Sequence, residues 1–411
     1  MLGVGIVGMY LSAPGQSFSV AVFIDPMLVD LGLARSSYSG AYLFAGLCGG
    51  LLLPVIGRLL DRYGARRMLP ALGLLLGFAC VWMSSTRSLG GLYLGFTMIR
   101  CIGQGALTLT ATWLVGEWFQ KRRGLAMGLV GLGGTLSVMT IPQLNDLLIS
   151  EVGWRSTWWV LAGLVWVGLI LPSLLLIRDR PEDLGLLPDA RWPGDAAAAG
   201  RPGEATAEAA ERPEIEQSWQ VGEAMRMSSF WKLLAVLATT SLVGTGLIFH
   251  QISLLGVHGV SRKTALLLLA GQAVVGSVVS IVAGWLTDRW PERYLLAASM
   301  LFLAVGVILL LWLPSPGWVI AYVVALGLQG GIIRSTGTAV WINYYGRRCQ
   351  GAIRGAAMAV LVVAAACGPL PLALSWDLLG SYDAALAVFA VMPFVAGVVV
   401  LTARPPQAQE S

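Results

Sequence analysis

Long apolar segments, separated by short polar stretches, dominate the chain. Each has roughly the 20 residues that an α-helix needs to cross the hydrocarbon core of a bilayer. The segments are apolar throughout and do not alternate between apolar and polar residues, which favours helices over a β-barrel. The pattern predicts twelve membrane-spanning helices, at residues 1–24, 37–57, 68–85, 89–116, 124–148, 156–177, 230–254, 263–286, 294–313, 317–344, 351–375 and 383–402.

Lys and Arg are unevenly divided between the two sets of connecting loops. One set, completed by Arg404, holds 19 of the 27 basic residues and lies at 58–67, 117–123, 178–226, 287–293 and 345–354. The opposite set holds five: Arg35, Arg87, Arg155, Arg262 and Lys263. Because basic loops remain on the cytoplasmic side, this distribution predicts that the first set and both termini are cytoplasmic.

Composition narrows the class of protein further. The chain of 411 residues is 56% hydrophobic and only 12% charged, with a mean hydropathy of +0.75, which excludes an ordinary soluble protein. The loop arginines account for the pI of about 9.1, so we expect acidic membrane lipid, and no nucleic acid, as their counterpart. The five cysteines have no paired spacing, and no catalytic or nucleotide-binding motif is present. We therefore expect no enzyme activity, no metal and no cofactor.

The chain repeats itself at an offset of 227 residues. Gly32–Arg35 returns as Gly259–Arg262, and the charged loop at 57–69, GRLLDRYGARRML, returns at 284–296 as GWLTDRWPERYLL. A constant offset predicts two six-helix halves in the same orientation, related by an axis along the membrane normal.

Domain boundaries follow from this repeat. We expect an N-terminal half at 1–177, a cytoplasmic linker at 178–226 and a C-terminal half at 227–411 with a short cytoplasmic tail. The linker is rich in Ala, Gly, Pro and Glu at 195–214, which predicts disorder there. Residues 217–227, QSWQVGEAMRM, are predicted to form a short amphipathic helix.

These features resemble the major facilitator superfamily. Twelve spans in two halves, with a G-x-L-x-D-R-x-G-x-R loop between spans two and three, carry the resemblance. Three further stretches are similar to bacterial members of the monocarboxylate-transporter and oxalate:formate-antiporter group: EWFQKRRGLAMGL at 117–129, RDRPEDLGLLPD at 178–189 and YGRRCQGAIRGAA at 345–357. The resemblance implies a monomeric multi-pass transporter in the inner cell membrane.

The resemblance also implies a conformational latch at the charged loops. The loop aspartate of the superfamily sits between the halves, so Asp61 is expected to face the start of span eleven and Asp288 the start of span five. An aspartate beside a helix N-terminus is stabilised there, and the contact breaks when the halves rock apart. The remaining expected latch residues are Gly57, Arg62, Gly64, Arg66, Glu117 and Arg289. Alternatively, the loop arginines only enforce topology.

Two ionisable residues, Arg100 and Arg334, lie well inside predicted spans, with no acidic residue at comparable depth. A charge in a span costs about 2.5–3.5 kcal/mol on insertion scales, so each marks a candidate functional site. Spans one, four, seven and ten line the central cavity in the superfamily, and a guanidinium matches a carboxylate bidentately. The predicted substrate-binding residues are Arg334, Arg100, Gln104, Gln16, Thr338, Trp341, His250, Gln272 and Asn343. The alternative is that the arginines bond backbone carbonyls or nearby amides.

Together these patterns predict a secondary active transporter that moves a small organic anion, a mono- or dicarboxylate, by alternating access. Span eight lacks the charged pair, and span one the lysine, of many monocarboxylate transporters, so both anion exchange and proton-coupled symport remain open. His250 is interpreted either as a proton carrier or as a gate or structural histidine. Two alternative functions remain: an exporter of lipophilic compounds, given the 16 tryptophans, and a non-transporting membrane sensor.

Overall fold

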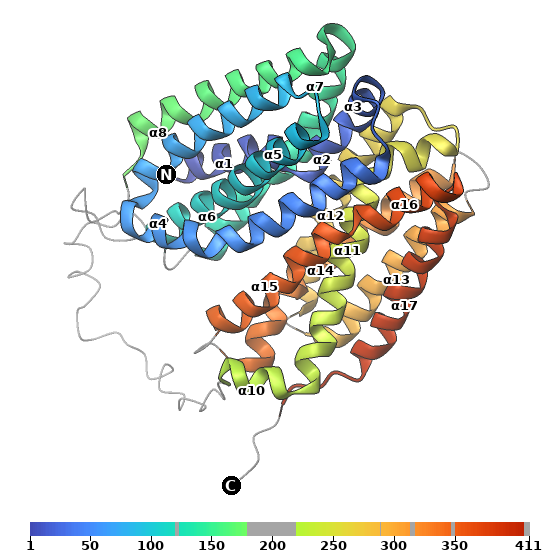
Figure 1. Ribbon diagram of the computed structural model, residues 1–411. Helices are drawn as coiled ribbons and strands as arrows, with labels where there is room; N and C mark the ends of the chain where they lie inside the picture. Colours follow the sequence, from blue (N-terminus) through green and yellow to red (C-terminus); the bar gives the residue numbers. More distant parts are fainter. Residues whose placement is uncertain (120–122, 179–218, 288, 313–316, 347–349, 407–411) are drawn as a thin grey trace, which may run out of the picture.

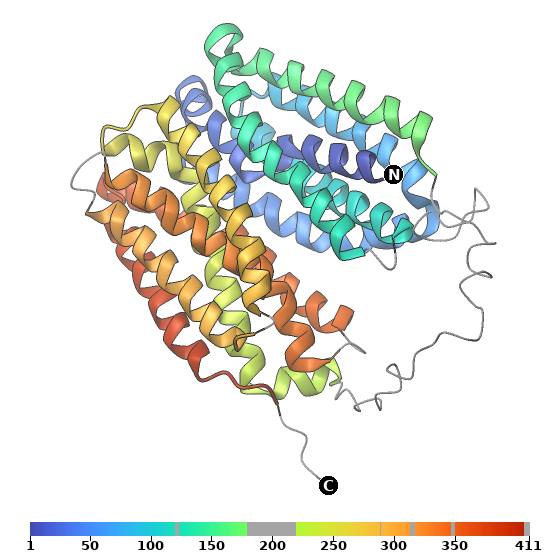
Figure 2. The ribbon, with the colours of Figure 1, turned by 180° about the vertical axis from the view of Figure 1, so that it is seen from behind.

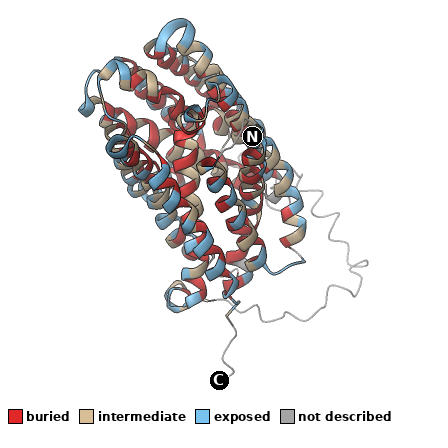
Figure 3. Ribbon diagram, turned by 90° about the vertical axis from the view of Figure 1, so that its right-hand side faces the viewer, coloured by how far each residue is buried: buried red, intermediate tan, exposed pale blue. Residues whose placement is uncertain are grey.

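The structure is a computed structural model that describes residues 1–119, 123–178, 219–287, 289–312, 317–346 and 350–406. Every regular element in these ranges is a helix, and two helical halves lie side by side (Figure 1). Large apolar side chains such as Val167, Ile281 and Trp312 cover the outer surface, whereas the buried positions lie between helices (Figure 3). This arrangement is that of a multi-pass membrane protein.

The N-terminal half contains the six predicted spans, two pairs of which are joined at a single glycine. Span one is broken into short pieces, and the turns between spans two and three and between spans five and six lie at Gly64 and Gly153. The elements are α1 (Leu2–Leu11), η1 (Ala13–Gly15), α2 (Ser17–Val20), η2 (Ala21–Phe23), α3 (Ile24–Leu31), α4 (Arg35–Ser85), α5 (Leu89–Ile99), η3 (Arg100–Leu107), α6 (Thr108–Trp118), α7 (Arg123–Val165), η4 (Trp166–Ile170) and α8 (Leu171–Leu176).

The C-terminal half forms spans seven to twelve. Its elements are α10 (Val221–Arg226), α11 (Ser228–Val257), α12 (Arg262–Thr287), α13 (Glu292–Leu311), α14 (Trp318–Tyr345), α15 (Gln350–Cys367), α16 (Pro369–Leu379) and α17 (Asp383–Leu401). The predicted linker helix is present as α10, and span eleven is divided between α15 and α16. Most of the predicted linker lies outside the described residues.

The count of spans depends on how bends are treated. Nine described helices are long and apolar enough to cross a membrane, and the bent pair Leu2–Gly15 and Ser17–Leu31 makes ten. One of the nine, Ala126–Leu176, has 51 residues and turns at Gly153, so it supplies two crossings. The fourth span, composed of α5, η3 and α6, completes the twelve-helix fold that the sequence predicts.

The internal repeat extends to the backbone conformation. Gly32 and Gly259, which are 227 residues apart, have φ values of 63° and 76°. Gly153 and Gly380 form a second pair at the same offset, with φ values of 80° and 70°. Only glycine adopts positive φ at no steric cost, so the same turns are encoded twice.

The halves touch at one end and diverge at the other. They meet where the start of α4 lies beside α16 and α12 packs against α7, and they spread apart toward the end that carries the two termini (Figures 1 and 2). At the closed end small residues allow close contact: a Cβ on Gly46 of α4 would lie 2.6 Å from Ala366 of α15. At the open end, a Cβ on Gly57 or Gly355 would meet no atom within 4 Å. The structure is therefore open toward its termini.

Candidate functional site

A cavity of about 890 Å³ lies between the two halves and receives side chains from both. Aliphatic side chains such as Leu53, Leu303 and Leu361 form much of its wall. Its polar lining includes Ser12, Gln16, Arg100, Gln104, Thr108, Thr112, Thr135, Ser137, Ser241, Gln272, Gln329 and Arg334. None of the described lining residues is an Asp, a Glu or a His. Both membrane arginines therefore reach one cavity that has no described acidic lining.

Arg100 is held by groups from spans one and two. Its guanidinium carbon lies 4.0 Å from the centroid of the Tyr42 ring, a cation–π contact. Its Nη1 donates to the Gly15 carbonyl and to the Ser17 hydroxyl, at 3.4 Å each. The residue is only 5% exposed, and its Nε has no partner among the described residues. The long bonds and the Nε leave donor capacity for a ligand.

The position of Arg100 depends on two irregular segments that touch. Pro14 and Gly15 break span one, as the sequence predicts, and the two parts of the span are bent by 43°. Arg100 begins η3, a π-helical segment of the kind often found at functional sites. A Cβ on Gly15 would lie 2.2 Å from the Ile99 carbonyl oxygen, so only glycine permits this approach. The break thus brings the Gly15 carbonyl to the guanidinium.

Arg334 lines the opposite wall from α14. Its Nη2 lies 3.9 Å from the position that a Cβ on Gly276 of α12 would occupy, so a small residue leaves room for it. Gln272 and Gln329 line the same half of the cavity, and the Nε2 of Gln329 has no acceptor among the described residues. Gln329 is 6% exposed, so its amide is a buried donor that favours an acceptor-rich ligand.

Five of the nine predicted substrate-binding residues line the cavity: Gln16, Arg100, Gln104, Gln272 and Arg334. Gln16 also donates from Nε2 to the Ser12 hydroxyl at 3.1 Å. The side chain of Thr338 lies outside the described residues.

Three predicted residues lie away from the described cavity lining. His250 is buried in the C-terminal half, where a ring nitrogen lies 3.1 Å from the Pro369 carbonyl oxygen, which favours the structural interpretation. Trp341 packs against Phe230, because its helix face is covered by α11 at that depth. Asn343 donates to Glu292 near the end of α14.

The latch residues are only partly described. The side chain of Asp61 and the whole of Asp288 lie outside the description, so the two predicted inter-half contacts remain predictions. Gly64 has φ of 72° and forms the predicted tight turn. Arg62 lies over the ring of Tyr63 at 5.4 Å.

The remaining predicted latch residues differ in their exposure and contacts. Arg289 lies 4.0 Å from the ring of Trp285, Arg66 is exposed, and Glu117 is half-buried. Open space surrounds the Cβ position of Gly57.

Sequence reasoning missed two supports of the site. Tyr42 gives no sequence signal, because an aromatic residue in a span usually packs against other apolar groups. Gln329 could have been found: it is an isolated amide in the apolar run GLQGGII at 327–333 of span ten, only five residues before Arg334.

Comparisons with known proteins agree with this architecture. The Major Facilitator Superfamily profile matches residues 6–369 and, in a second match, 251–411. The structure is similar to a bacterial homolog of the human lysosomal transporter Spinster in an inward-facing and occupied conformation, with a TM-score of 0.72 and 16% identity over 98% of this chain and 96% of that one. At 16% identity, this similarity shows a shared fold only.

Two sequence relatives have narrower coverage. The riboflavin transporter RibJ of Trypanosoma cruzi is 27% identical over 179 residues, which is 42% of this chain and 38% of that protein. Monocarboxylate transporter 1 of Homo sapiens is 29% identical over 187 residues, 44% of this chain and 37% of that protein. The chain thus matches less than two fifths of the length of each. From the profile and the fold together, the chain belongs to the Major Facilitator Superfamily of membrane transporters.

Proposed function

We propose that the protein is a secondary active transporter that carries a small organic anion, a mono- or dicarboxylate, across the inner cell membrane. The observation that carries this proposal is the cavity between the halves, which holds Arg100 and Arg334 and has no Asp or Glu among its described lining. A carboxylate that enters it offsets the cost of keeping guanidinium groups at membrane depth. Planar guanidinium donors also match a carboxylate geometrically.

The shape of the molecule supports alternating access as the mechanism. The cavity lies between halves that touch at one end only, so rocking of the halves exposes it to the other side. With the basic loops and both termini in the cytoplasm, the open end faces the cytoplasm and the conformation is inward-facing.

The cavity lining favours anion exchange over proton-coupled symport. The described lining residues include no Asp, Glu or His that could carry a proton, and His250 is engaged elsewhere. An exchanger needs no proton-carrying group, because the anion carried in the opposite direction returns the transporter to its starting conformation. Similarity to monocarboxylate transporter 1 supports the substrate class.

A larger, mainly apolar substrate is the second candidate. A volume of about 890 Å³ exceeds what a two- or three-carbon acid fills, and Leu53, Leu303 and Leu361 line it. The similarity to RibJ is consistent with an aromatic substrate. Export of lipophilic compounds would need no cavity cation.

Uptake into proteoliposomes separates these functions. A panel of labelled mono- and dicarboxylates, together with riboflavin and a lipophilic cation, is tested with and without a pH gradient and with and without internal anion. The proposal expects saturable carboxylate uptake, stimulated by internal anion and indifferent to the pH gradient. Uptake of the lipophilic cation without any carboxylate uptake would contradict it.

A further inference from the structure

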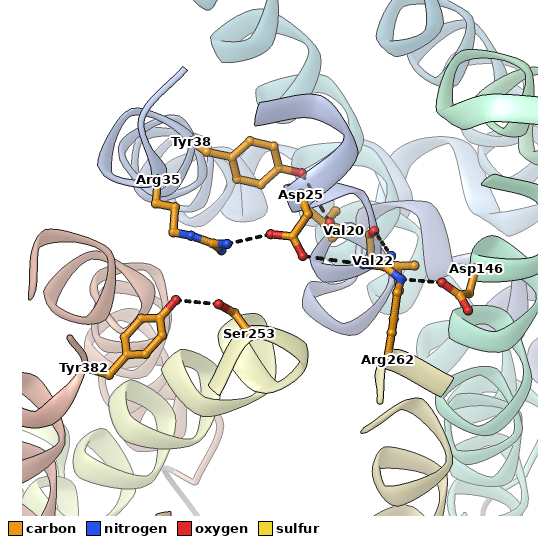
Figure 4. A network of polar contacts seen from close by, with 9 residues as sticks. All are labelled: Val20, Val22, Asp25, Arg35, Tyr38, Asp146, Ser253, Arg262 and Tyr382. Carbon is orange, nitrogen blue, oxygen red and sulfur yellow. Dashed lines mark hydrogen bonds and ion pairs between the residues drawn. The ribbon is translucent and has the colours of Figure 1, made fainter. Parts of the chain in front are cut away.

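A cluster of charged side chains joins the halves at the end opposite the termini. It comprises Asp25, Arg35, Asp146, Arg262 and Asp377, and is called here the rim cluster (Figure 4 shows all but Asp377). Asp25, Arg35 and Asp146 belong to the N-terminal half, and Arg262 and Asp377 to the C-terminal half. The cluster is separate from the cavity, because none of its residues is among the cavity lining.

Arg262, the first residue of α12, reaches three groups of the other half. Its Nε donates to Asp146 of α7, its Nη1 lies 3.5 Å from Asp25 Oδ2, and its Nη2 donates to the Val22 carbonyl at 2.5 Å (Figure 4). A single side chain thus links the C-terminal half to both α7 and the end of span one. Such charge-assisted bonds are stronger than neutral ones.

Arg35, the first residue of α4, approaches the interface from the other side. Its Nη2 lies 2.7 Å from the remaining oxygen of Asp25, Oδ1, and its guanidinium carbon lies 5.7 Å from the ring of Trp376 in α16. The neighbouring Ser36 amide donates to Asp377 of α16 at 2.7 Å. Because that amide belongs to the first turn of α4, the Asp377 carboxylate is also stabilised by the helix dipole.

The internal repeat relates the two arginines. Arg35 and Arg262 are 227 residues apart, and each starts a helix three residues after a glycine with positive φ. The repeat relates α4, which lies against the end of span eleven, to α12, which lies against the end of span five. The two repeated positions therefore converge on the same carboxylate, Asp25, from opposite halves.

We propose that the rim cluster is a lock that holds the halves together at this end and must break for the cavity to open there. Rocking of the halves separates α12 from α7 and α4 from α16, so it cannot proceed while Arg262 and Asp377 keep their partners. Arg262 is 31% and Asp25 39% exposed, so water can replace the lost contacts. The lock thus favours the conformation that is closed at this end, and it is weak enough to break in each transport cycle.

The test measures a distance across the rim in the full-length protein. Spin labels are placed at Val29 of α3 and Leu379 of α16, both exposed, in a variant without native cysteines. Arg262→Gln should raise the ratio of long-distance to short-distance population about fivefold, as expected for an ion pair that is one-third exposed. Asp377→Ala, which removes the second crossing contact, should shift the ratio in the same direction, and the double variant should shift it further.

Arg155→Gln is the matched control. Arg155 pairs with Asp30 at the same end, but both residues belong to the N-terminal half. This variant should leave the distance distribution unchanged. An unchanged distribution in both Arg262→Gln and Asp377→Ala, or an equal shift in Arg155→Gln, would overturn the proposal. Because no substrate is needed, the result is independent of which compound the protein carries.

Discussion

Spans four and ten each place one arginine in the cavity, but the local helix geometry and the contacts of the two arginines differ. Arg100 begins a π-helical segment and lies against Tyr42, whereas Arg334 lies in the regular helix α14. The repeat partner of Arg100 is Gly327, so the two arginines do not occupy equivalent positions. The halves have diverged at the candidate site, as expected for a site whose ligand has no twofold symmetry.

The rim shows the opposite relation. Arg35 and Arg262 remain at equivalent positions, and the glycines that precede them keep the same backbone conformation. At the rim the repeat is preserved in these arginines and glycines, although not in their acidic partners, whereas in the cavity the arginines themselves are not at equivalent positions. This contrast suggests that the rim serves the movement shared by the superfamily, whereas the cavity serves the particular substrate.

The largest expected effect concerns Arg334. Arg334→Gln should lower carboxylate transport about 100-fold, because a bidentate charge-assisted contact contributes about 3 kcal/mol. Arg334→Lys should lower carboxylate transport about tenfold, because a point charge does not reproduce the planar donor geometry of a guanidinium. Uptake per folded molecule and melting temperature are measured on the same preparations. Arg87→Gln, outside the cavity, controls for the loss of one charge, and full activity of Arg334→Gln would refute its role.

Arg100 already donates to Gly15 and Ser17, which use part of its hydrogen-bonding capacity, so its loss should weaken substrate binding without abolishing it. We expect Arg100→Gln to raise the apparent substrate constant about tenfold, with a larger change for dianions than for monoanions. Concentration dependence of uptake gives the constant. An equal change for both classes of anion would contradict direct contact with charge.

Tyr42 makes its cation–π contact with Arg100, so a substitution of Tyr42 tests the Arg100 side of the cavity. Tyr42→Leu should raise the apparent constant about fivefold, because a desolvated cation–π contact contributes about 1 kcal/mol. Tyr42→Phe keeps the ring and should stay close to wild type. If both variants lose activity equally, the Ser17–Tyr42 hydroxyl contact, and not the ring, is the important feature.

The π-helical segment makes the packing of the halves unequal as well. Gly103 and Gly330 are repeat partners, but a Cβ on Gly103 would lie 3.0 Å from the Gly15 backbone, whereas one on Gly330 meets nothing within 4 Å. Gly103→Ala should therefore destabilise the protein by about 1–2 kcal/mol, and Gly330→Ala should be neutral or slightly stabilising. Thermal unfolding in detergent measures both, and equal melting temperatures would argue against the tight contact.

The smallest effect is expected at the predicted latch. Asp61→Asn should favour the conformation that is open toward the termini by about 1 kcal/mol or less, if the helix dipole is the main contribution. The labelling rate of a cysteine at Thr112, which lines the cavity, should rise when the reagent is added from that side. An unchanged labelling rate would show that Asp61 does not stabilise closure at this end.

The fold was largely predictable from the sequence because membrane helices are encoded by length and hydrophobicity alone. The broken span one and the repeat were visible in Pro14, Gly15 and the paired glycines. The sequence predicts a loop at 149–155 between spans five and six, whereas the structure turns the chain at Gly153 alone. That difference was not visible, because it depends on the backbone conformation of a single residue.

The site was predictable only in part. Arg100, Arg334 and three glutamines could be found because a polar side chain in a span is costly and rare. Trp341, Asn343 and His250 were assigned by helix periodicity or polarity, which do not show where a neighbouring helix covers a face. The rim cluster was missed although Arg35 and Arg262 stand in a repeated motif, because Asp146 lies 116 residues from Arg262 and Asp377 lies 341 residues from Ser36.

The central claim is that the cavity selects its ligand by negative charge. The most direct measurement is the affinity of the purified protein for the carboxylate identified by the uptake panel, relative to its uncharged amide isostere. We predict that wild type prefers the acid at least about 100-fold, and that the double variant Arg100→Gln/Arg334→Gln binds the two compounds about equally. A wild-type preference near one, or a double variant that keeps the wild-type preference, would contradict the account.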